Sequence, residues 1–350
     1  MSVSVDIRKS FGDFTLDVRF EAGQETLSLL GDSGCGKSMT LRCIAGVIRP
    51  DEGVITINGR TVFDSSRKIN LKPQQRRVGY LFQNYALFPN MTIVENIMAG
   101  LERRKDINKK ERRELAMRYV DQFKLGGMED RYPSEISGGQ QQRTALARIL
   151  ASEPDLLMLD EPFSALDATL RWEMEKVVRD TISGFPGTTL LVSHDRDEVY
   201  RLSDRVCVYK QGHIDVIDEK WHLFRHPQTA TAARLSGCKN LSPAHKEGGM
   251  AVADDWGLEF PVSEEEDFNC IGIRAHMFSL CGPDDPYAFE YEVANRIEDT
   301  FSYILEIRKK GSDTPKTIRW EIEKALHMDV PDTGYVNFPE EELLLLRDED

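Results

Sequence analysis

The chain lacks a long apolar run: no stretch of about 18 apolar residues occurs, so no transmembrane helix is expected. The first residues, Met1–Asp6, lack the basic and apolar pattern of a secretory leader, so none is expected either. The six cysteines show no C-x-x-C spacing. That pattern favours reduced thiols over a disulfide framework or a cysteine zinc site.

An excess of basic charge is also missing. The net charge is −14, and residues 235–350 hold 11 Lys and Arg against 26 Asp and Glu. A nucleic-acid binder usually carries a basic face, so no nucleic-acid partner is expected. His222 and His226 lie four residues apart, but no carboxylate or cysteine joins them at metal-ligand spacing, which favours a surface helix over a zinc site.

The strongest motif is a glycine-rich segment that fits the phosphate-binding pattern G-x-x-x-x-G-K-[ST]. It comprises Gly31, Asp32, Ser33, Gly34, Cys35, Gly36, Lys37 and Ser38. An apolar run at Thr26–Leu30 predicts a buried strand before it, and Thr40–Ala45 has helical spacing after it. In such a loop, backbone N–H groups at a helix N-terminus cradle phosphate oxygens. We expect Lys37 to reach the β- and γ-phosphates and Ser38 to ligate Mg²⁺.

Three further apolar runs are predicted to be core strands, and each ends in a polar residue. They are Val78–Phe82 before Gln83, Leu156–Leu159 before Asp160 and Glu161, and Thr188–Ser193 before His194. Ligands of α/β sheets bind at the carboxyl ends of the strands, so these side chains could face one crevice. Adjacent strand residues point to opposite faces, so one carboxylate suits Mg²⁺ and the other a water molecule. The alternative is a pair of N-cap carboxylates before Pro162.

Two other positions suggest ligand contacts. Ser137 fits an N-cap of the helical segment Thr144–Ala151, and Gly138 and Gly139 would leave the first N–H groups of that helix open to an anion. Phe11 lies between predicted strands and is either a core aromatic or a ring that stacks on adenine.

The pattern changes after residues 227–237, which contain Pro227 and alternating Ala and Thr and are predicted to be a linker. Short strands bounded by Gly, Pro and Asp follow, which predicts an all-β barrel or sandwich. The predicted strands are Met250–Ala253, Leu258–Val262, Ile271–Arg274, Tyr291–Ile297, Tyr303–Arg308, Thr317–Glu321 and Gly334–Phe338. We therefore expect one domain at 1–230 and a β-rich domain at 235–350.

In order and spacing, the motifs of residues 1–230 resemble those of the ATP-binding subunit of an ABC transporter. The matching segments are Walker A (Gly31–Ser38), the Q-loop (Gln83), the signature motif (Ile136–Gln140, with Ile where Leu is usual), Walker B with its glutamate (Leu156–Glu161), the D-loop (Ser164–Asp167) and the switch histidine (His194). The resemblance implies an α/β P-loop NTPase domain with a helical subdomain at about 84–150, followed by the small all-β, barrel or OB-like, domain.

The resemblance also implies ATP hydrolysis by a homodimer, with each ATP between one subunit's Walker A and the other's signature motif. The implied nucleotide-binding residues are Phe11, Gly31, Ser33, Gly34, Cys35, Gly36, Lys37, Ser38, Met39, Ser137, Gly138, Gly139 and Gln140. The implied metal residues are Ser38, Gln83 and Asp160. By the same resemblance, Glu161 polarises the attacking water, His194 contacts the γ-phosphate and Gln83 touches the water and Mg²⁺.

The segment Tyr85–Pro89 resembles the importer subgroup, in which a groove near the Q-loop receives a short permease helix. This implies two transmembrane permease subunits, an external solute-binding protein and a peripheral place on the cytoplasmic face of the membrane. The β-rich domain resembles the regulatory domain of importers for oxyanions, sugars, iron and polyamines. The β-rich domain, which lies outside the ATP site, is thus expected to respond to the imported solute.

The expected solute is molybdate or tungstate; sulfate, a maltose-type sugar, ferric iron and polyamine are alternatives. Lys239, Asn240 and Ser242 are predicted to bind the imported oxyanion and so inhibit the ATPase, although the domain could instead only dimerise. A soluble ABC ATPase of DNA repair is disfavoured because only about 50 residues separate Gln83 from Ser137, too few for a coiled-coil insertion. A translation factor would usually carry two cassettes, and a ligand sensor would not need the intact ATP motifs.

Overall fold

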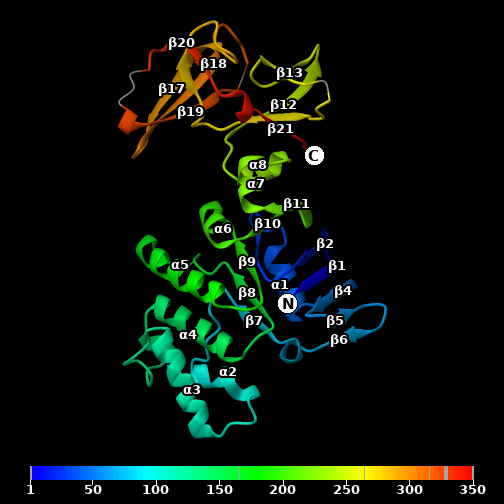
Figure 1. Cartoon of the computed structure of the whole chain (residues 1–350), viewed down its shortest axis with the longest axis vertical. Coiled ribbons are helices and arrows are strands. Elements are labelled where there is room, and N and C mark those ends of the chain that lie inside the picture. The colour runs from blue at the N-terminus through cyan, green and yellow to red at the C-terminus, as the bar shows by residue number, and fades with distance from the viewer. Residues whose placement is uncertain (1, 165, 264, 315, 327–329, 349–350) are drawn as a thin grey trace. The chain divides into compact units, whose positions relative to one another are not determined.

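The structure is a computed structural model that describes residues 2–164, 166–263, 265–314, 316–326 and 330–348. The chain forms two compact units, Met1–Lys220 and Trp221–Asp350 (Figure 1). The first unit therefore ends before residue 230, where the sequence placed its end. The expected linker at 227–237 is partly a helix, α8 (Ala230–Leu235), whose N-cap Thr229 accepts a hydrogen bond from the Ala232 N–H at 3.1 Å. The small side chains of α8 pack into a core of the second unit, which explains the earlier boundary.

The first unit contains two sheets. One is antiparallel, in the order β2-β1-β4-β5-β6, and consists of β1 (Val3–Phe11), β2 (Phe14–Ala22), β4 (Glu52–Ile57), β5 (Arg60–Asp64) and β6 (Ile69–Asn70). The other has the order β11-β10-β3-β9-β8-β7 and consists of β3 (Thr26–Gly31), β7 (Val78–Leu81), β8 (Leu156–Asp160), β9 (Thr188–Ser193), β10 (Arg205–Lys210) and β11 (His213–Glu219). In this second sheet β10, β3, β9, β8 and β7 are parallel and β11 is an antiparallel edge.

Helices connect the parallel strands, as crossover connections require. They are α1 (Lys37–Ala45), α2 (Ile93–Gly100), α3 (Lys109–Gln122), α4 (Gly138–Ala151), α5 (Ala168–Ser183) and α6 (Arg196–Leu202), with 3₁₀ turns η1 (Pro73–Gln75), η2 (Leu101–Arg103) and η3 (Pro133–Glu135). Figure 1 shows α2, α3 and α4 grouped at one end of the first unit. This group corresponds to the helical subdomain expected at about 84–150.

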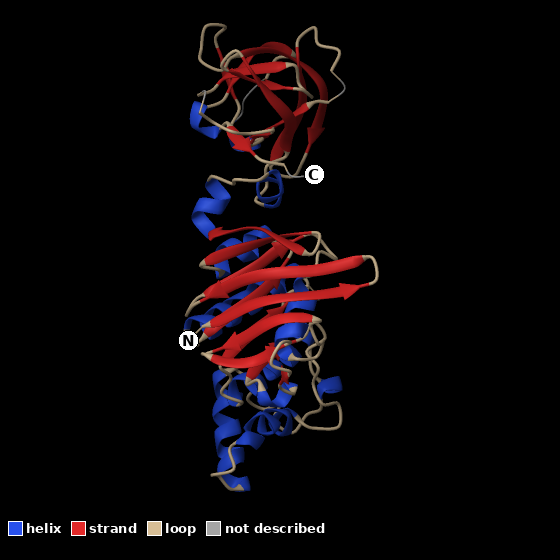
Figure 2. Cartoon of the chain, turned by 90° about the vertical axis from the view of Figure 1, so that its right-hand side faces the viewer, coloured by secondary structure: helices blue, strands red, loops and turns tan. Residues whose placement is uncertain are grey.

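Both faces of the parallel sheet are buried, which accounts for its uninterrupted apolar strands. Along β8, Leu156 and Met158 join the core on the side of α1 and the antiparallel sheet, whereas Leu157 and Leu159 join the core of the helices. The same alternation turns Asp160 toward α1. In Figure 2 the antiparallel sheet faces the viewer and the helices lie behind it and below.

Helix α1 is anchored at its carboxyl end by a buried arginine. The Arg76 guanidinium donates hydrogen bonds to the Cys43 and Ile44 carbonyls, each at 2.8 Å, and to the Leu71 carbonyl at 2.9 Å. Burial lowers the pKa of Arg76 to about 10, but the side chain stays charged at neutral pH. A cation at this end is favourable because the last carbonyls carry the negative end of the helix dipole. Arg76 thus holds the carboxyl end of α1, opposite the end that is predicted to bind phosphate.

The second unit is β-rich, as expected. After α7 (Lys220–Arg225) and α8, one sheet has the order β14-β13-β12-β15-β21 and contains β12 (Asn240–Glu247), β13 (Met250–Ala253), β14 (Leu258–Pro261), β15 (Cys270–Ile273) and β21 (Leu344–Leu346). The other has the order β16-β20-β17-β18-β19 and contains β16 (Ser279–Cys281), β17 (Phe289–Glu298), β18 (Ser302–Lys309), β19 (Ile318–Glu323) and β20 (Thr333–Asn337), with 3₁₀ turns η4 (Lys324–Leu326) and η5 (Glu340–Glu342). One core joins both sheets. All the strands predicted here from the sequence pattern are present, whereas β16 and β21 were not predicted.

Candidate functional site

The glycine-rich loop lies between β3 and α1, as the sequence predicts. Gly34 and Gly36 have φ values of 83° and 108°, a region that residues with a Cβ rarely adopt. At Gly31, a Cβ would lie 2.8 Å from both the Cys35 Sγ and the Tyr209 carbonyl oxygen. The loop therefore needs glycine for its conformation and for its close approach to β10. It winds around the amino end of α1, where unpaired N–H groups favour an anion.

Lys37 and Ser38 occupy the first turn of α1. The Lys37 Nζ donates hydrogen bonds to the Gly31 and Asp32 carbonyls, each at 2.8 Å, so the ammonium lies against the loop itself. The Ser38 Oγ donates to Asp160 Oδ1 at 2.7 Å. Asp160 is 4% exposed and comes from the end of β8. The structure thus brings together a hydroxyl and a carboxylate that are 122 residues apart in the sequence.

The pair of Ser38 and Asp160 fits Mg²⁺. Magnesium prefers hard oxygen ligands and is usually held by one or two protein groups together with phosphate oxygens and water. Within the part of the chain that the structure describes, no group of three or more His, Cys, Asp and Glu residues could hold a metal. A site that shares its metal with a nucleotide phosphate needs no such group.

A tyrosine that the sequence analysis did not single out completes the contacts of Asp160. The Tyr80 hydroxyl, on β7, donates to Asp160 Oδ2 at 2.7 Å. The pKa of this phenol is raised above its ordinary value, first by burial and then by the Asp160 charge, so it keeps its proton. A tyrosine in a predicted buried strand signals an unpaired hydroxyl that needs a polar partner. That signal was available in the sequence.

Glu161 and His194 lie side by side at the ends of β8 and β9. The His194 Nδ1 is 3.5 Å from the Glu161 Oε1, and the Glu161 N–H donates to the Val192 carbonyl at 3.0 Å. Glu161 has a φ of 46°, a left-handed conformation that few residues other than glycine adopt. This backbone turn separates the direction of the Glu161 side chain from that of Asp160. The two carboxylates therefore have different surroundings, as the sequence analysis expected.

Gln83 is exposed, and its Nε2 donates to the Ser164 Oγ at 3.2 Å. The structure thus joins the predicted Q-loop to the predicted D-loop rather than to Ser38 or Asp160. Ala165 of the D-loop segment lies outside the described residues. Asp167 caps α5 and accepts hydrogen bonds from the N–H groups of Thr169 and Leu170. A metal contact by Gln83 stays a prediction.

Ser137 caps α4, which begins within the predicted signature motif. Its Oγ accepts a hydrogen bond from the Gln140 N–H at 3.3 Å, and its own N–H donates to the Gln140 side chain at 2.9 Å. Gly139 packs so closely that a Cβ would lie 2.8 Å from Leu170.

Phe11 ends β1 and is partly buried, with its ring 6.4 Å from that of Phe14 and the Lys9 ammonium 5.7 Å from its centroid. Phe14 in turn packs beside the loop, because a Cβ on Gly36 would lie 3.2 Å from its ring. Phe11 therefore belongs to an aromatic pair next to the phosphate loop. Met39 packs partly into the core beneath the loop.

The segment after Gln83 is held by Arg148 of α4. The Arg148 guanidinium donates to the Tyr85 carbonyl at 3.2 Å and lies 5.0 Å from the Phe88 ring centroid. Tyr85 has a φ of 60° and is 8% exposed, inside the helical core. Phe88 is 46% exposed. Of the two aromatic residues, only Phe88 offers a surface to a partner.

The structure corrects the prediction that Asn240 and Ser242 of the second unit bind an oxyanion. The Asn240 amide donates to the Ile273 and Arg319 carbonyls and its oxygen accepts from the Arg319 N–H. The Ser242 hydroxyl donates to the Pro243 carbonyl and accepts from the Asp255 N–H. The Asn240 side chain joins β12 to β15 and β19, and the Ser242 hydroxyl joins β12 to the turn after β13, so their donor groups are already used within the unit. Lys239 alone does not make a site, and a ligand role of this unit stays a prediction without residues assigned to it.

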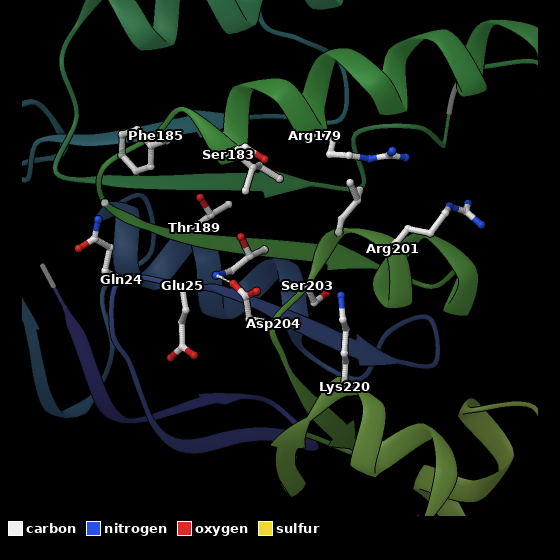
Figure 3. Close-up of a pocket in the computed structure, with 14 residues that line it drawn as sticks. Gln24, Glu25, Arg179, Ser183, Phe185, Thr189, Arg201, Ser203, Asp204 and Lys220 are labelled. Atoms are coloured by element: carbon white, nitrogen blue, oxygen red, sulfur yellow. Dashed lines mark hydrogen bonds between the residues drawn. The ribbon is translucent and has the colours of Figure 1, made fainter.

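A pocket of about 440 Å³ lies at the opposite edge of the parallel sheet, beside Thr26 and Thr189 at the amino ends of β3 and β9 (Figure 3). Arg179 and Arg201 line it, and both form ion pairs with the buried Glu175. The one Glu175 carboxylate thus pairs with both guanidinium groups. The pocket contains no residue of the predicted nucleotide site, so it is separate from that site.

The strand, the glycine-rich loop, the helix and the Ser38–Asp160 pair define a P-loop nucleotide hydrolase. Comparison with known proteins agrees. The family model described as "ABC transporter" matches residues 15–164. A solved dimeric post-hydrolysis state of the ATP-binding cassette MJ0796, bound to ADP and Pi, aligns with 63% of this chain and 99% of its own, at 26% identity and a TM-score of 0.54.

Among curated proteins, the sulfate/thiosulfate import ATP-binding protein CysA of Vibrio vulnificus is 36% identical over 310 residues, covering 85% of this chain and 86% of that protein. CysA of Vibrio cholerae is 37% identical over 297 residues, covering 82% and 77%. CysA of Mannheimia succiniciproducens is 39% identical over 263 residues, covering 73% and 72%. The chain belongs to the family of ABC transporter ATP-binding proteins, and it is an ATPase of that family.

Proposed function

We propose that this chain is the ATP-hydrolysing subunit of a membrane importer for sulfate or thiosulfate. The relatives whose printed names give those anions match most of this chain, the second unit included. They favour the sulfate alternative over molybdate or tungstate, the expectation from the sequence. Sulfate and molybdate are both tetrahedral dianions, and the ATP-hydrolysing subunit does not select the solute. The residues of this chain therefore do not themselves distinguish the two anions. The proposal of ATP hydrolysis rests on one observation, the contact of Ser38 with Asp160 beside the glycine-rich loop.

Nucleotide binding would use the loop N–H groups and Lys37. The Lys37 ammonium would exchange the Gly31 and Asp32 carbonyls for phosphate oxygens. Ser38 and Asp160 would hold Mg²⁺, which when bound neutralises charge on the β- and γ-phosphates. Phe11, through its place beside Phe14, would stack on the adenine.

Hydrolysis would use the residues at the ends of β8 and β9. Glu161 would orient the attacking water and accept its proton, and His194, 3.5 Å from Glu161, would contact the γ-phosphate and hold the carboxylate in place. Gln83 would sense the nucleotide through the D-loop serine that it contacts.

A homodimer would complete the site. The amino end of α4, with Ser137 and Gly138 exposed, would face the phosphates bound by the partner's loop. MJ0796, the cassette of similar fold, has been solved as a dimer. No helix in the described part of this chain is long and apolar enough to span a membrane. The import function in the names of the relatives supports two transmembrane permease subunits and an external solute-binding protein as partners, with the chain on the cytoplasmic face of the membrane.

The solute can be tested in the host. If this chain is removed, we expect loss of growth on sulfate as the sulfur source and rescue by a reduced sulfur compound such as cysteine. Wild-type chain should restore growth on sulfate, and Lys37→Ala should not, because that variant loses the phosphate-binding ammonium. A control measures molybdenum-dependent enzyme activity, which should be unchanged. Normal sulfate uptake together with lost molybdenum-dependent activity would contradict the sulfate proposal and restore molybdate.

Phe88 should contribute to coupling with the permease. Phe88→Ala removes an exposed ring, so ATP affinity and the ATPase activity of the isolated chain should stay near wild type. Solute-stimulated ATPase of the assembled transporter should fall by about tenfold or more, since exposed aromatic anchors dominate many interfaces. Tyr200→Ala, which removes an equally exposed ring from α6, is the matched control. Loss of ATP affinity in Phe88→Ala would instead assign Phe88 to the structure of the helical core.

A further inference from the structure

The two oxygens of the Asp160 carboxylate have different partners. Oδ1 accepts the Ser38 hydroxyl at 2.7 Å, and Oδ2 accepts the Tyr80 hydroxyl at 2.7 Å. Asp160 is 4% exposed, so neither oxygen can rely on bulk water. A buried carboxylate oxygen without a donor is costly. The Tyr80 hydroxyl therefore satisfies the oxygen that faces away from Ser38.

The position of the Tyr80 ring is itself fixed. β7 pairs in parallel with β8, with Tyr80 opposite Met158. The ring is 9% exposed and packs on Phe82, with centroids 4.1 Å apart. The hydroxyl is thus held in place by strand pairing and ring packing.

From this geometry we infer that Tyr80 is a positioning residue of the Mg²⁺ site: it holds Asp160 so that Oδ1 points to Ser38 and the metal. The inference rests on the proposed magnesium site. Without the phenol, the carboxylate could rotate about its Cβ–Cγ bond, and Oδ2 would compete for the Ser38 hydroxyl or the metal. Tyr80 also ties the metal ligand to the strand that leads into Gln83, so the metal and the predicted Q-loop share one support.

The experiment measures metal binding directly on the full chain. Mn²⁺ is titrated by electron paramagnetic resonance in the presence of saturating ADP, for the wild type, Tyr80→Phe, Tyr209→Phe and Asp160→Asn. Tyr209→Phe is the matched control, because its buried hydroxyl contacts Thr40 of the same helix at 3.2 Å but not Asp160. Nucleotide affinity is measured separately in excess EDTA.

Tyr80→Phe should weaken Mn²⁺ binding by about 10- to 100-fold, the usual effect of losing a partner of a metal ligand. Tyr209→Phe should not weaken it, and neither variant should change metal-free nucleotide affinity. The Mg²⁺ concentration for half-maximal ATPase should rise in Tyr80→Phe, while kcat at saturating Mg²⁺ recovers. A merely structural tyrosine would lower the melting temperature and leave this metal dependence unchanged.

The outcomes separate the two proposals. If Asp160→Asn loses Mn²⁺ but Tyr80→Phe binds it like the wild type, the positioning role of Tyr80 is wrong and the magnesium site stands. If the wild type binds no Mn²⁺ with ADP, or Asp160→Asn binds it normally, the magnesium site is wrong and the role of Tyr80 falls with it. If Tyr80→Phe is unstable, its destabilisation is compared with that of Tyr80→Phe in an Asp160→Asn background. Equal destabilisation in both backgrounds would show that the two groups are uncoupled and would overturn the inference.

Discussion

Glu161→Gln should reduce steady-state ATP hydrolysis by about 10²- to 10⁴-fold, the range expected when a general base is removed. The amide keeps the size of the side chain but cannot accept the proton of the attacking water. Lys37, Ser38 and Asp160 are unchanged, so ATP affinity should remain near wild type. Because ATP persists in the site, gel filtration with ATP should show a stable dimer of the variant.

A glutamate with the same unusual backbone provides the control. Glu153 has a φ of 48° but lies at the end of α4, where its exposed side chain forms an ion pair with Arg104. Exposed ion pairs contribute little to stability, so Glu153→Gln should hydrolyse ATP like the wild type. Near-normal turnover by Glu161→Gln would contradict the assignment of the base. Loss of ATP binding by that variant would show instead that the substitution disturbs the loop.

The sequence predicted the parts of the site that depend on local pattern. A glycine-rich loop after an apolar strand can be recognised from the sequence alone. Polar residues at the carboxyl ends of the strands lie at one edge of the sheet because the strands are parallel. Hence Ser38 and Asp160 are in contact, and Glu161 and His194 are in contact, as the proposed chemistry requires. The buried strands were equally easy to predict. A sheet covered on both faces has strands of continuous apolar sequence, without alternating polar residues.

The errors arose where an amino-acid type has two common uses. Asn240 and Ser242 resemble anion ligands in the sequence, yet in a buried strand such side chains satisfy backbone groups of their neighbours. Tyr85 belongs to the segment that resembles the permease-binding groove of importers, yet its side chain packs in the helical core. A tyrosine in a buried strand indicates a hydroxyl that needs a polar partner, but the partner of Tyr80 is 80 residues away in the sequence. Only the tertiary pairing of β7 with β8 identifies that partner as Asp160.

Lys37→Ala should abolish tight ATP binding, with a loss of affinity of about 100-fold or more. The reason is that hydrogen bonds to charged groups are each stronger than neutral ones, and the ammonium would serve at least two phosphate oxygens. The affinity for adenosine, which has no phosphate, should be equal in the variant and the wild type. Titration with a fluorescent ATP analogue and with adenosine would measure both. ATP-dependent dimerisation should be lost as well, because it requires bound triphosphate.

The substitution also removes the hydrogen bonds that Lys37 donates to the Gly31 and Asp32 carbonyls and to the Cys35 sulfur, so a loss of loop structure must be separated from a loss of charge. Melting temperatures without and with ATP make that separation. A lower melting temperature without nucleotide reports the loop, whereas loss of the ATP-induced increase reports phosphate binding. Lys220→Ala, at the far edge of the sheet, should keep the full increase. If Lys37→Ala bound ATP as tightly as this control does, the glycine-rich loop would not be the phosphate site, and the proposed mechanism would be wrong at its first step.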